Sequence, residues 1–537
     1  MKNSDLFVAC LVNEWVDYVF GVPGEENLDF LESLRTSGIR LIVTRNEQTA
    51  VFMAATYGRM TGKPWVALAT LGPWATNMVT GIAYAHLGAM PVVTITGQKP
   101  IKASKQWQFQ VIDVVGMMQP ITKRSTSVVN GARIPSTVRE AFKLAEMERP
   151  WPVSIELPED IAAEEITGYA PMPYEKIRRP EIDAKMLQIL VDRLQSAKRP
   201  MILVGAGANR KRIGKYLTQL ITKHNIPFFT SQMGKGVVDE SLPQFLGTAA
   251  LTSGDYVHDA IQQADLIIAI GHDTIEKPTN IVDPTKTTFI HVNFYPSKVD
   301  TLYMPSLEVI GDIGNTLWQL CEATIDTKNW DLTPIRETKK TIDARLARQV
   351  ATSKELDHIT PAFVIDIVQD LYQQDGIVCL DNGLYKVYFA RLYQALHPQS
   401  LLLDNALATM GAWYSSAMMC KLLYPEKPII AVVGDGGILM NLGDIQTAVS
   451  LGLDLVIVIL NDNAYGMIRW KQQHGWFADY GLDLTNPDFV MLATAFGAHG
   501  HHVSKPSDLA STIATAKASK GVHIIDVDFR YPEDVVE

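Results

Sequence analysis

Short apolar runs alternate with longer amphipathic stretches along most of the chain. In the first third, the apolar runs stand at 18–22, 41–43, 66–70, 91–96 and 153–156. Apolar residues at helical spacing over 5–18 and 47–60 predict helices between these runs. Short, continuously apolar strands separated by helices are typical of a mostly parallel sheet that is covered on both faces.

The same alternation recurs twice more along the chain. A second set of strands is predicted at 201–204, 227–230, 266–270 and 288–292, after a helix at 182–196. A third set is predicted at 377–380, 429–433, 455–460 and 523–527. The Pro-rich, charged stretch 160–182 and the polar stretch 325–356 are predicted linkers. The predicted fold class is therefore α/β, with three doubly wound parallel-sheet domains at 1–165, 183–325 and 357–537.

Length and charge narrow the class of protein further. One hydrophobic core rarely serves more than about 250–300 residues, so a chain of 537 residues is expected to hold several domains. Lys and Arg number 48 against 58 Asp and Glu, giving a net charge of −10. This balance argues against a dedicated binder of nucleic acid or of an anionic membrane.

Targeting signals and cysteines favour a cytoplasmic protein. The N-terminus has no long apolar region of the kind found in signal peptides. The apolar runs fall far short of the ~18 residues needed to span a bilayer. No two of the four cysteines form a CxxC pair, so reduced, buried thiols are expected.

The most informative motif is the glycine-rich turn Gly434-Asp435-Gly436-Gly437. It follows the strand 429–433 and precedes a helix predicted to begin near Met440. Backbone N–H groups in such a turn can face a phosphate, and a carboxylate at the strand end can hold a divalent cation. The next strand, 455–460, leads into Asn461-Asp462, and adjacent parallel strands place their carboxyl ends side by side. Asp435 and Asp462 are therefore predicted to share one Mg²⁺.

These motifs resemble those of the thiamine diphosphate (ThDP) enzymes. Over about residues 3–530 the chain resembles the acetolactate synthase (acetohydroxyacid synthase) large-subunit branch of that family. The segments that carry the resemblance are 20–24, 45–50, 57–63, 72–77, 409–411 and 434–466. The resemblance implies a pyrimidine-binding domain, a central domain and a diphosphate-binding domain. It also implies a homodimer or homotetramer, with ThDP between the first domain of one subunit and the third of another.

The resemblance assigns roles to individual residues around ThDP and Mg²⁺. Glu47 matches the catalytic carboxylate that hydrogen-bonds the aminopyrimidine ring of the cofactor. The metal ligands would be Asp435, Asp462 and the carbonyl of Ala464. Met410 matches the apolar residue that supports the bent shape of ThDP. The other residues expected to bind the cofactor are Pro73, Asn77, Thr409, Gly434, Gly436, Gly437, Tyr465, Gly466 and Met467.

The sequence does not decide which of two products the reaction would give. Phe109 and Gln110 match pocket residues of acetohydroxyacid synthases, and Gln106-Trp107-Gln108 stands where pyruvate decarboxylases tend to carry a His pair. Both features favour decarboxylation of pyruvate followed by ligation to a second 2-keto acid, which gives 2-acetolactate. Glu25, in contrast, resembles the acidic residue of decarboxylases that release an aldehyde, and no Lys stands at 24–30.

Two further features of the sequence leave open whether the chain is catalytic and whether it binds FAD. Trp74 and Trp413 stand where relatives carry small residues, as do Trp65, Trp107 and Trp151, so a non-catalytic ThDP-binding homologue is a third hypothesis. The central domain has Gly205-Ala206-Gly207 after a strand but lacks the GxGxxG fingerprint of dinucleotide sites. The stretch 270–278 looks more like that of the catabolic acetolactate synthases, which bind no FAD. Whether this chain binds FAD therefore stays open, and its absence is favoured. A small regulatory subunit is equally open.

Overall fold

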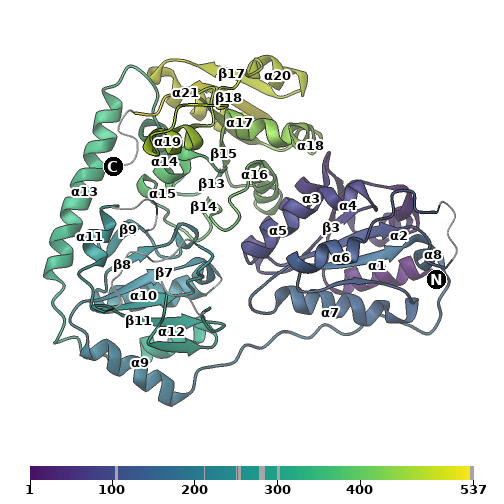
Figure 1. Cartoon of the computed structure of the whole chain (residues 1–537), viewed down its shortest axis with the longest axis horizontal. Helices are drawn as coiled ribbons and strands as arrows, with labels where there is room; N and C mark the ends of the chain where they lie inside the picture. Colours follow the sequence, from purple (N-terminus) through teal and green to yellow (C-terminus); the bar gives the residue numbers. More distant parts are fainter. Residues whose placement is uncertain are drawn as a thin grey trace. The chain divides into compact units, whose positions relative to one another are not determined.

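The structure is a computed structural model that describes residues 1–102, 107–210, 212–249, 251, 255–276, 285–298 and 303–532 (Figure 1). It divides into two compact units. The first holds residues 1–178 together with 407–425 and 441–453. The second holds residues 179–406, 426–440 and 454–537. No helix among the described residues is long and apolar enough to cross a membrane.

The first unit contains a six-stranded parallel sheet in the order β2-β1-β3-β4-β6-β5. Its strands are β1 (Tyr18–Gly21), β2 (Arg40–Val43), β3 (Trp65–Ala69), β4 (Val92–Gln98), β5 (Ser125–Ser127) and β6 (Val153–Pro158). Strands β3, β4 and β6 are buried along their whole length, which explains why apolar residues dominate their sequences. The strand order reverses between β1 and β3, and ligands of open α/β sheets bind outside the carboxyl ends at such a point.

Helices cover both faces of this sheet. Helices α1 (Asn3–Asn13), α2 (Leu28–Ser37) and α7 (Ile134–Glu146) pack together on one face, and α3 (Glu47–Thr61) packs with α5 (Val79–Leu87) on the other. The remaining helices are α4 (Pro73–Asn77), α6 (Val114–Met118), α8 (Glu159–Ala163), α16 (Ala412–Leu423) and α18 (Ile445–Ser450). The predicted helix 5–18 ends earlier, at Asn13, because Trp15 has a positive φ of 65°.

The central sheet lies in the second unit and is also parallel, in the order β12-β11-β10-β7-β8-β9. Its strands are β7 (Pro200–Val204), β8 (Phe228–Thr230), β9 (Phe245–Thr248), β10 (Leu266–Ile270), β11 (Thr288–Asn293) and β12 (Leu307–Ile310). One face is covered by α9 (Ala184–Ser196), α10 (Ile213–His224) and α12 (Ile313–Glu322). The other is covered by α11 (Val257–Ile261) and α13 (Thr333–Lys354).

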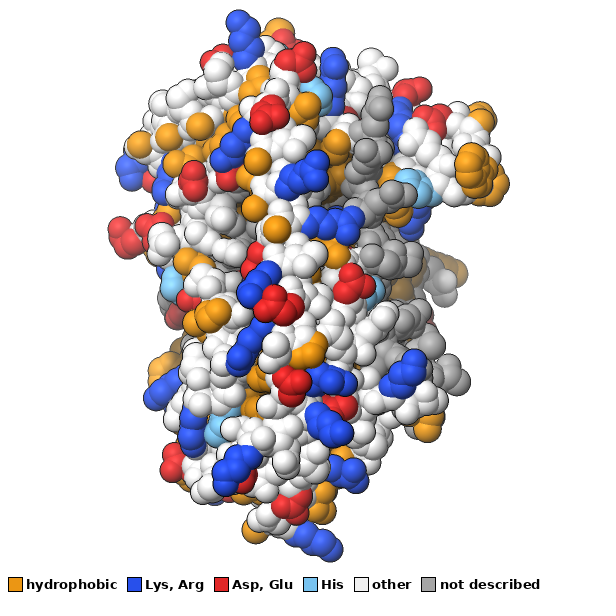
Figure 2. All heavy atoms as spheres, turned by 90° about the vertical axis from the view of Figure 1, so that its left-hand side faces the viewer, with side chains coloured by type: hydrophobic (Ala, Val, Ile, Leu, Met, Phe, Trp, Pro, Cys, Tyr) orange, Lys and Arg blue, Asp and Glu red, His pale blue; other side chains and the backbone are white. Residues whose placement is uncertain are grey.

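Helix α13 occupies most of the predicted linker 325–356. It is anchored by buried Ile335 and Ile342, which belong to the apolar core of the central sheet. Basic and acidic side chains mix on the face that carries α13 (Figure 2). Among them, Lys340 pairs with Glu337 one helical turn away at 2.7 Å, with both side chains exposed. Ion pairs of this exposed kind contribute little to stability.

The third sheet is parallel in the order β14-β13-β15-β16-β18-β17 and lies in the second unit. Its strands are β13 (Ile377–Leu380), β14 (Leu401–Leu402), β15 (Ile429–Gly434), β16 (Leu455–Asn461), β17 (His499–Val503) and β18 (Val522–Asp528). Its helices are α14 (Pro361–Tyr372), α15 (Leu384–Leu392), α17 (Asp435–Ile438), α19 (Gly466–His474), α20 (Phe489–Ala495) and α21 (Pro506–Ala518). All three sheets agree with the predicted fold class of three doubly wound parallel-sheet domains.

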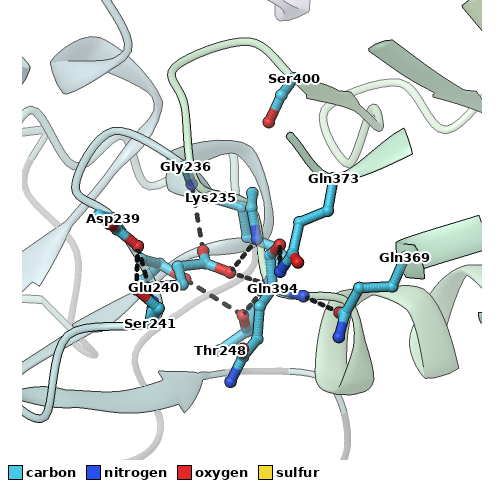
Figure 3. A network of polar contacts seen from close by, with 12 residues as sticks. Lys235, Gly236, Asp239, Glu240, Ser241, Thr248, Gln369, Gln373, Gln394 and Ser400 are labelled. Atoms are coloured by element: carbon cyan, nitrogen blue, oxygen red, sulfur yellow. Dashed lines mark hydrogen bonds and ion pairs between the residues drawn. The ribbon is translucent and has the colours of Figure 1, made fainter. Parts of the chain in front are cut away.

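A buried polar network joins the central and third sheets within the second unit (Figure 3). Glu240 accepts hydrogen bonds from Lys235 Nζ at 2.7 Å and from the backbone N–H of Ala395 at 2.9 Å. The N–H of Glu240 donates in turn to the carbonyl of Ala395 at 3.2 Å. The Lys235 and Glu240 side chains are 1% and 0% exposed. One carboxylate therefore fixes the turn after β8 to the segment that follows α15.

Candidate functional site

The glycine-rich turn of the third sheet lies where the strand order reverses, between β13 and β15. Asp435 follows β15 directly and begins α17, so the helix starts at the motif itself and not near Met440 as predicted. The Asp435 side chain is 1% exposed and accepts hydrogen bonds from the N–H of Gly436 at 3.0 Å and from Asn486 Nδ2 at 2.7 Å. This carboxylate is thus held rigidly at the carboxyl edge of the sheet.

Asp462 lies at the end of the neighbouring strand. The register pairs Gly434 of β15 with Leu460 of β16, so both strands end together. Burial, and then the negative charge of Asp435, raise the pKa of Asp462 to about 7. Burial also raises the pKa of Asp435. Two carboxylates that destabilise each other's charge are the arrangement that a bound divalent cation would relieve.

Asn486 is a component of this site that sequence reasoning missed. Besides Asp435, its Nδ2 atom faces Asn461 Oδ1 at 3.0 Å and Asn463 Oδ1 at 3.2 Å. Its own Oδ1 atom is buried and has no hydrogen-bond partner among the described residues. The site is therefore rich in hard oxygen atoms and poor in donors, a chemistry that fits Mg²⁺.

The protein alone offers only part of a coordination shell. Within the described ranges, no group of three or more His, Cys, Asp or Glu side chains could hold a metal ion. Magnesium commonly takes one or two carboxylates and completes its shell with water and phosphate oxygens. Asp435 and Asp462, with the carbonyl of buried Ala464 nearby in sequence, fit a cation that binds together with a diphosphate.

The glycines of the turn are also required by the chain's own packing. A Cβ atom at Gly436 would lie 2.7 Å from the ring of Tyr465, and one at Gly437 would overlap the carboxylate of Asp381. The N–H of Gly434 donates to the Tyr385 hydroxyl at 3.1 Å. At Gly466 a Cβ atom would lie 3.0 Å from Asp462 Oδ2. Close packing thus accounts for small residues here, and contact with a diphosphate stays a prediction.

Tyr465 lies beside this turn, and Met467 follows it by two positions in sequence. Met467 is half-buried and packs against the apolar core of the third sheet. The N–H of Tyr465 donates to the carbonyl of Leu482 at 3.1 Å. Their predicted contacts with the cofactor stay predictions.

In the first unit, Glu47 is the first residue of α3. Asn46 caps this helix by accepting a hydrogen bond from the N–H of Gln48 at 2.8 Å. The Glu47 side chain is 3% exposed, and Asn77 Nδ2 donates to its Oε2 atom at 2.9 Å. Asn77 ends α4, which begins at exposed Pro73. The structure therefore brings together two predicted site residues that lie 30 positions apart.

Thr409 and Met410 precede α16 and are half-buried. Helix α16 packs on α3, where Thr56 Oγ1 and Ser416 Oγ share a hydrogen bond of 2.9 Å. The backbone N–H of Arg45, two residues before Glu47, donates to Asp444 Oδ1 at 2.8 Å. Segments 407–425 and 441–453 thus pack on the helix that carries Glu47.

The residues predicted to shape the substrate pocket follow β4. Gly72 has φ 58°, and a Cβ atom there would lie 2.7 Å from the carbonyl oxygen of Gln110, so Gln110 lies against the loop that leads to Pro73. Phe109 is 61% exposed and Trp107 is 90% exposed. Gln106 lies outside the described residues. The structure therefore places Gln110 beside the predicted site but leaves Phe109 free of a packed environment within this chain.

Glu25 is exposed, whereas its neighbour Glu26 is buried. Glu26 accepts hydrogen bonds from Lys99 Nζ and from Thr70 Oγ1, both at 2.5 Å. Although burial favours the neutral acid, these bonds hold the pKa of Glu26 below its ordinary value. A lysine, Lys99, thus reaches this turn from the end of β4. Sequence reasoning missed this pair, whose only local signal is a charged residue directly after a buried strand.

Most of the unexpected tryptophans are ordinary packing residues. Trp413 is buried and meets Tyr414 edge-on, with ring centroids 5.1 Å apart. Trp65 packs on Tyr57 at 3.6 Å, and Trp151 packs on His86 at 4.4 Å. Trp74 is half-buried within α4. The fold therefore accommodates the Trp413 side chain inside the core.

The comparison with protein families matches most of the chain. Three parts of the chain match the thiamine pyrophosphate (thiamine diphosphate) enzymes: the N-terminal TPP binding domain over 1–117, the central domain over 187–320 and the C-terminal TPP binding domain over 381–527. Glu47 lies in the first of these parts, and the Asp435–Asp462 site lies in the third. The chain therefore belongs to the thiamine pyrophosphate enzyme family.

Curated relatives narrow the comparison. The chain is 29% identical to the acetolactate synthase of Bacillus subtilis, covering 99% of this chain and 94% of the relative. It is 30% identical to a probable acetolactate synthase large subunit of Methanocaldococcus jannaschii, in an alignment that covers 98% of this chain and 92% of the relative. It is 29% identical to the catabolic acetolactate synthase of Raoultella terrigena, covering 98% and 95%. These full-length similarities relate the chain to acetolactate synthases.

Proposed function

We propose that this chain is a ThDP- and Mg²⁺-dependent carboligase that converts two molecules of pyruvate into 2-acetolactate and CO₂. The observation that carries the proposal is the buried Glu47 carboxylate at the start of α3, in a chain similar to acetolactate synthases over its whole length. The net reaction joins two carbon skeletons and releases one carboxylate as CO₂, so it needs no oxidant or reductant.

The proposed cofactor has two contact regions in the chain. Asp435, Asp462 and the Ala464 carbonyl would hold Mg²⁺, and Asn486 would orient the Asp435 carboxylate through its 2.7 Å hydrogen bond. When bound, ThDP supplies the electron sink that lets a 2-keto acid lose CO₂. Glu47 would hold the proton that the aminopyrimidine ring requires, in a setting where burial excludes water. Asn77 would keep the Glu47 carboxylate in one orientation.

The acceptor side of the pocket would be formed by Gln110 and Phe109, close in sequence to the end of β4. The buried Lys99–Glu26 pair anchors the turn that carries exposed Glu25. We therefore assign Glu25 as the group that decides between ligation and release of an aldehyde. A 2-keto acid decarboxylase is the second candidate function, supported by Glu25 itself.

The decisive experiment is an assay of both products in one sample. The purified chain is incubated with pyruvate, ThDP and Mg²⁺, and 2-acetolactate and acetaldehyde are measured together. Excess 2-acetolactate is expected. Excess acetaldehyde would overturn the carboligase in favour of the decarboxylase. Binding of ThDP without any loss of pyruvate or another 2-keto acid would identify a non-catalytic homologue.

The metal ligands give a second test, with D435N expected to weaken the binding of ThDP and Mg²⁺ by about 100-fold or more. D462N is expected to keep binding within about tenfold, because an amide oxygen still ligates Mg²⁺. Calorimetric titration of the metal-free protein with ThDP and Mg²⁺ measures both effects. D326N, an exposed carboxylate elsewhere in the second unit, is the control. Equal affinities for D435N and the wild type would contradict the assigned metal site.

The assembly follows from the same proposal. Relatives are named as large subunits, for example that of Haemophilus influenzae, which raises a small regulatory subunit as a partner to test. We propose a cytoplasmic homodimer or homotetramer with ThDP at the subunit interface. Light scattering on the purified chain measures the number of subunits, and a monomer that retains turnover would overturn an interfacial site.

A further inference from the structure

The central sheet has its own glycine turn at the point where its strand order reverses, between β10 and β7. The N–H of Gly205 donates to the carbonyl of Ile270 at 2.9 Å, and the N–H of Gly207 donates to that of Gly271 at 2.8 Å. A Cβ atom at Gly207 would lie 2.9 Å from the Gly271 carbonyl oxygen. These glycines are therefore required because the turns after β7 and β10 pack directly on each other.

The Glu276 carboxyl group lies on this turn. Its Oε1 atom accepts a hydrogen bond from the N–H of Ala206 at 2.8 Å, and its Oε2 atom accepts one from the Ser231 hydroxyl. The side chain is 3% exposed, and its own N–H donates to the carbonyl of Asp273 at 2.9 Å. One carboxyl group thus ties together the segments that follow β7, β8 and β10.

This arrangement does not fit the diphosphate of FAD. Dinucleotide sites place the diphosphate on free N–H groups at the start of a helix that directly follows the first strand. Here the Ala206 N–H is occupied by Glu276, and only the three-residue 3₁₀ turn Ala206–Ala208 follows β7 before α10 begins at Ile213. A diphosphate at this turn would meet a buried carboxyl group instead of free donors. Lys277 and Pro278 of the stretch 270–278 lie outside the described residues.

We propose that the Glu276 carboxyl group permanently occupies the position at this turn where the diphosphate of FAD would bind. The central domain of this chain therefore binds no FAD. This inference concerns the central domain alone and does not depend on the proposed reaction. Its tests measure binding and stability and not turnover, so they succeed or fail independently of the carboligase assay.

The first test is a titration of the purified full-length chain with FAD and, separately, with ADP. We expect no flavin absorbance to elute with the protein in gel filtration. We also expect no quenching of flavin fluorescence during the titration. Flavin bound at one molecule per chain would overturn the proposal. The ADP titration is made with saturating ThDP and Mg²⁺, so that the proposed diphosphate site of the third domain is already filled. Saturation with ADP at one per chain would then also overturn the proposal.

The second test is rescue of a truncated side chain by small carboxylates. In E276A the donors of Ala206 and Ser231 lose their acceptor, so a lower melting temperature is expected. Acetate or formate is expected to raise the melting temperature of E276A by about 2–4 °C and to leave the wild type unchanged. A melting temperature of E276A that equals the wild type and ignores acetate would contradict the proposal.

E276Q provides a readout even where E276A does not fold. Burial raises the pKa of Glu276 to about 7 against the hydrogen bonds from Ser231 and Ala206, and the Asp273 carboxylate adds to the rise. Because the folded protein holds this proton more tightly than the unfolded chain, the contribution of Glu276 to stability falls as pH rises from about 4.5 to about 7. The wild type is therefore expected to lose stability relative to E276Q over this interval, measured by melting temperature. Parallel profiles would overturn the proposal, because they would show that no buried carboxyl group occupies this turn in solution.

Discussion

The E47Q variant is expected to turn over pyruvate about 10²–10⁴-fold more slowly than the wild type, the usual contribution of a proton-transferring side chain. The amide that replaces the Glu47 carboxylate can still accept the hydrogen bond from Asn77 Nδ2, so the local structure is expected to survive. This amide cannot take up or hold a proton at the position of Glu47 Oε1 or Oε2. The loss therefore isolates the acid–base role from the packing role of the side chain.

The measurement separates chemistry from binding. Steady-state consumption of pyruvate gives the rate, and calorimetry gives the affinity for ThDP in the presence of Mg²⁺. E32Q serves as the matched control, because Glu32 lies on α2 in the same unit with an exposed side chain paired to Arg35. Full turnover by E47Q, or an equal loss in E32Q, would remove Glu47 from the mechanism.

Asn77 extends the same prediction to a positioning residue. Its amide donates to Glu47 Oε2 from the end of α4. N77A is expected to lower the rate by about 10–100-fold, less than E47Q, because the carboxylate remains but loses its orientation. A purely structural role would lower the melting temperature together with the rate, whereas N77A is expected to keep the wild-type melting temperature.

The fold was largely predictable because its central strands are continuously apolar. Strands β7 and β10, for example, are buried throughout and stand where the apolar runs predict them. Two of the edge strands were missed because their sequences are polar. Residues Ser125–Ser127 form β5, and the His-rich segment His499–Val503 forms β17. A strand with one free edge needs less apolar sequence, so periodicity alone does not reveal it.

The site was predictable only as far as its chemistry is local in sequence. Asp435 and Asp462 stand at the ends of adjacent apolar strands, and Glu47 follows the helix cap Asn46, four positions after β2 ends. Contacts between distant segments left no such pattern. Asn486 reaches Asp435 across 51 positions, and Lys99 reaches Glu26 across 73. Such partners depend on how the loops at the carboxyl edges fold over the strand ends, which a motif does not encode.

The second large effect is expected in the free energy of unfolding. It comes from the buried polar network that joins the central and third sheets. E240A is expected to destabilise the protein by about 3–5 kcal/mol, the usual loss when one partner of a buried ion pair is removed. Within the part of the chain that the structure describes, the Lys235 ammonium would stay buried with only Thr248 Oγ1, at 3.3 Å, as its remaining hydrogen-bond partner. The Ala395 N–H would lose its acceptor as well. Because Glu240 contacts segments of both sheets, both are expected to unfold at lower urea concentration together.

A double variant tests whether the uncompensated charge causes this loss. K235M/E240L removes both charges, and apolar side chains in place of a buried ion pair often restore most of the stability. It is therefore expected to be more stable than E240A, even though the Ala395 N–H still lacks an acceptor. E337A on α13 removes a partner of an exposed pair and is expected to change stability by at most about 1 kcal/mol. If urea unfolding gave E240A and E337A the same midpoint, the contact between the two sheets would not depend on the Lys235–Glu240 pair. A midpoint of K235M/E240L no higher than that of E240A would instead show that the uncompensated Lys235 charge does not cause the loss.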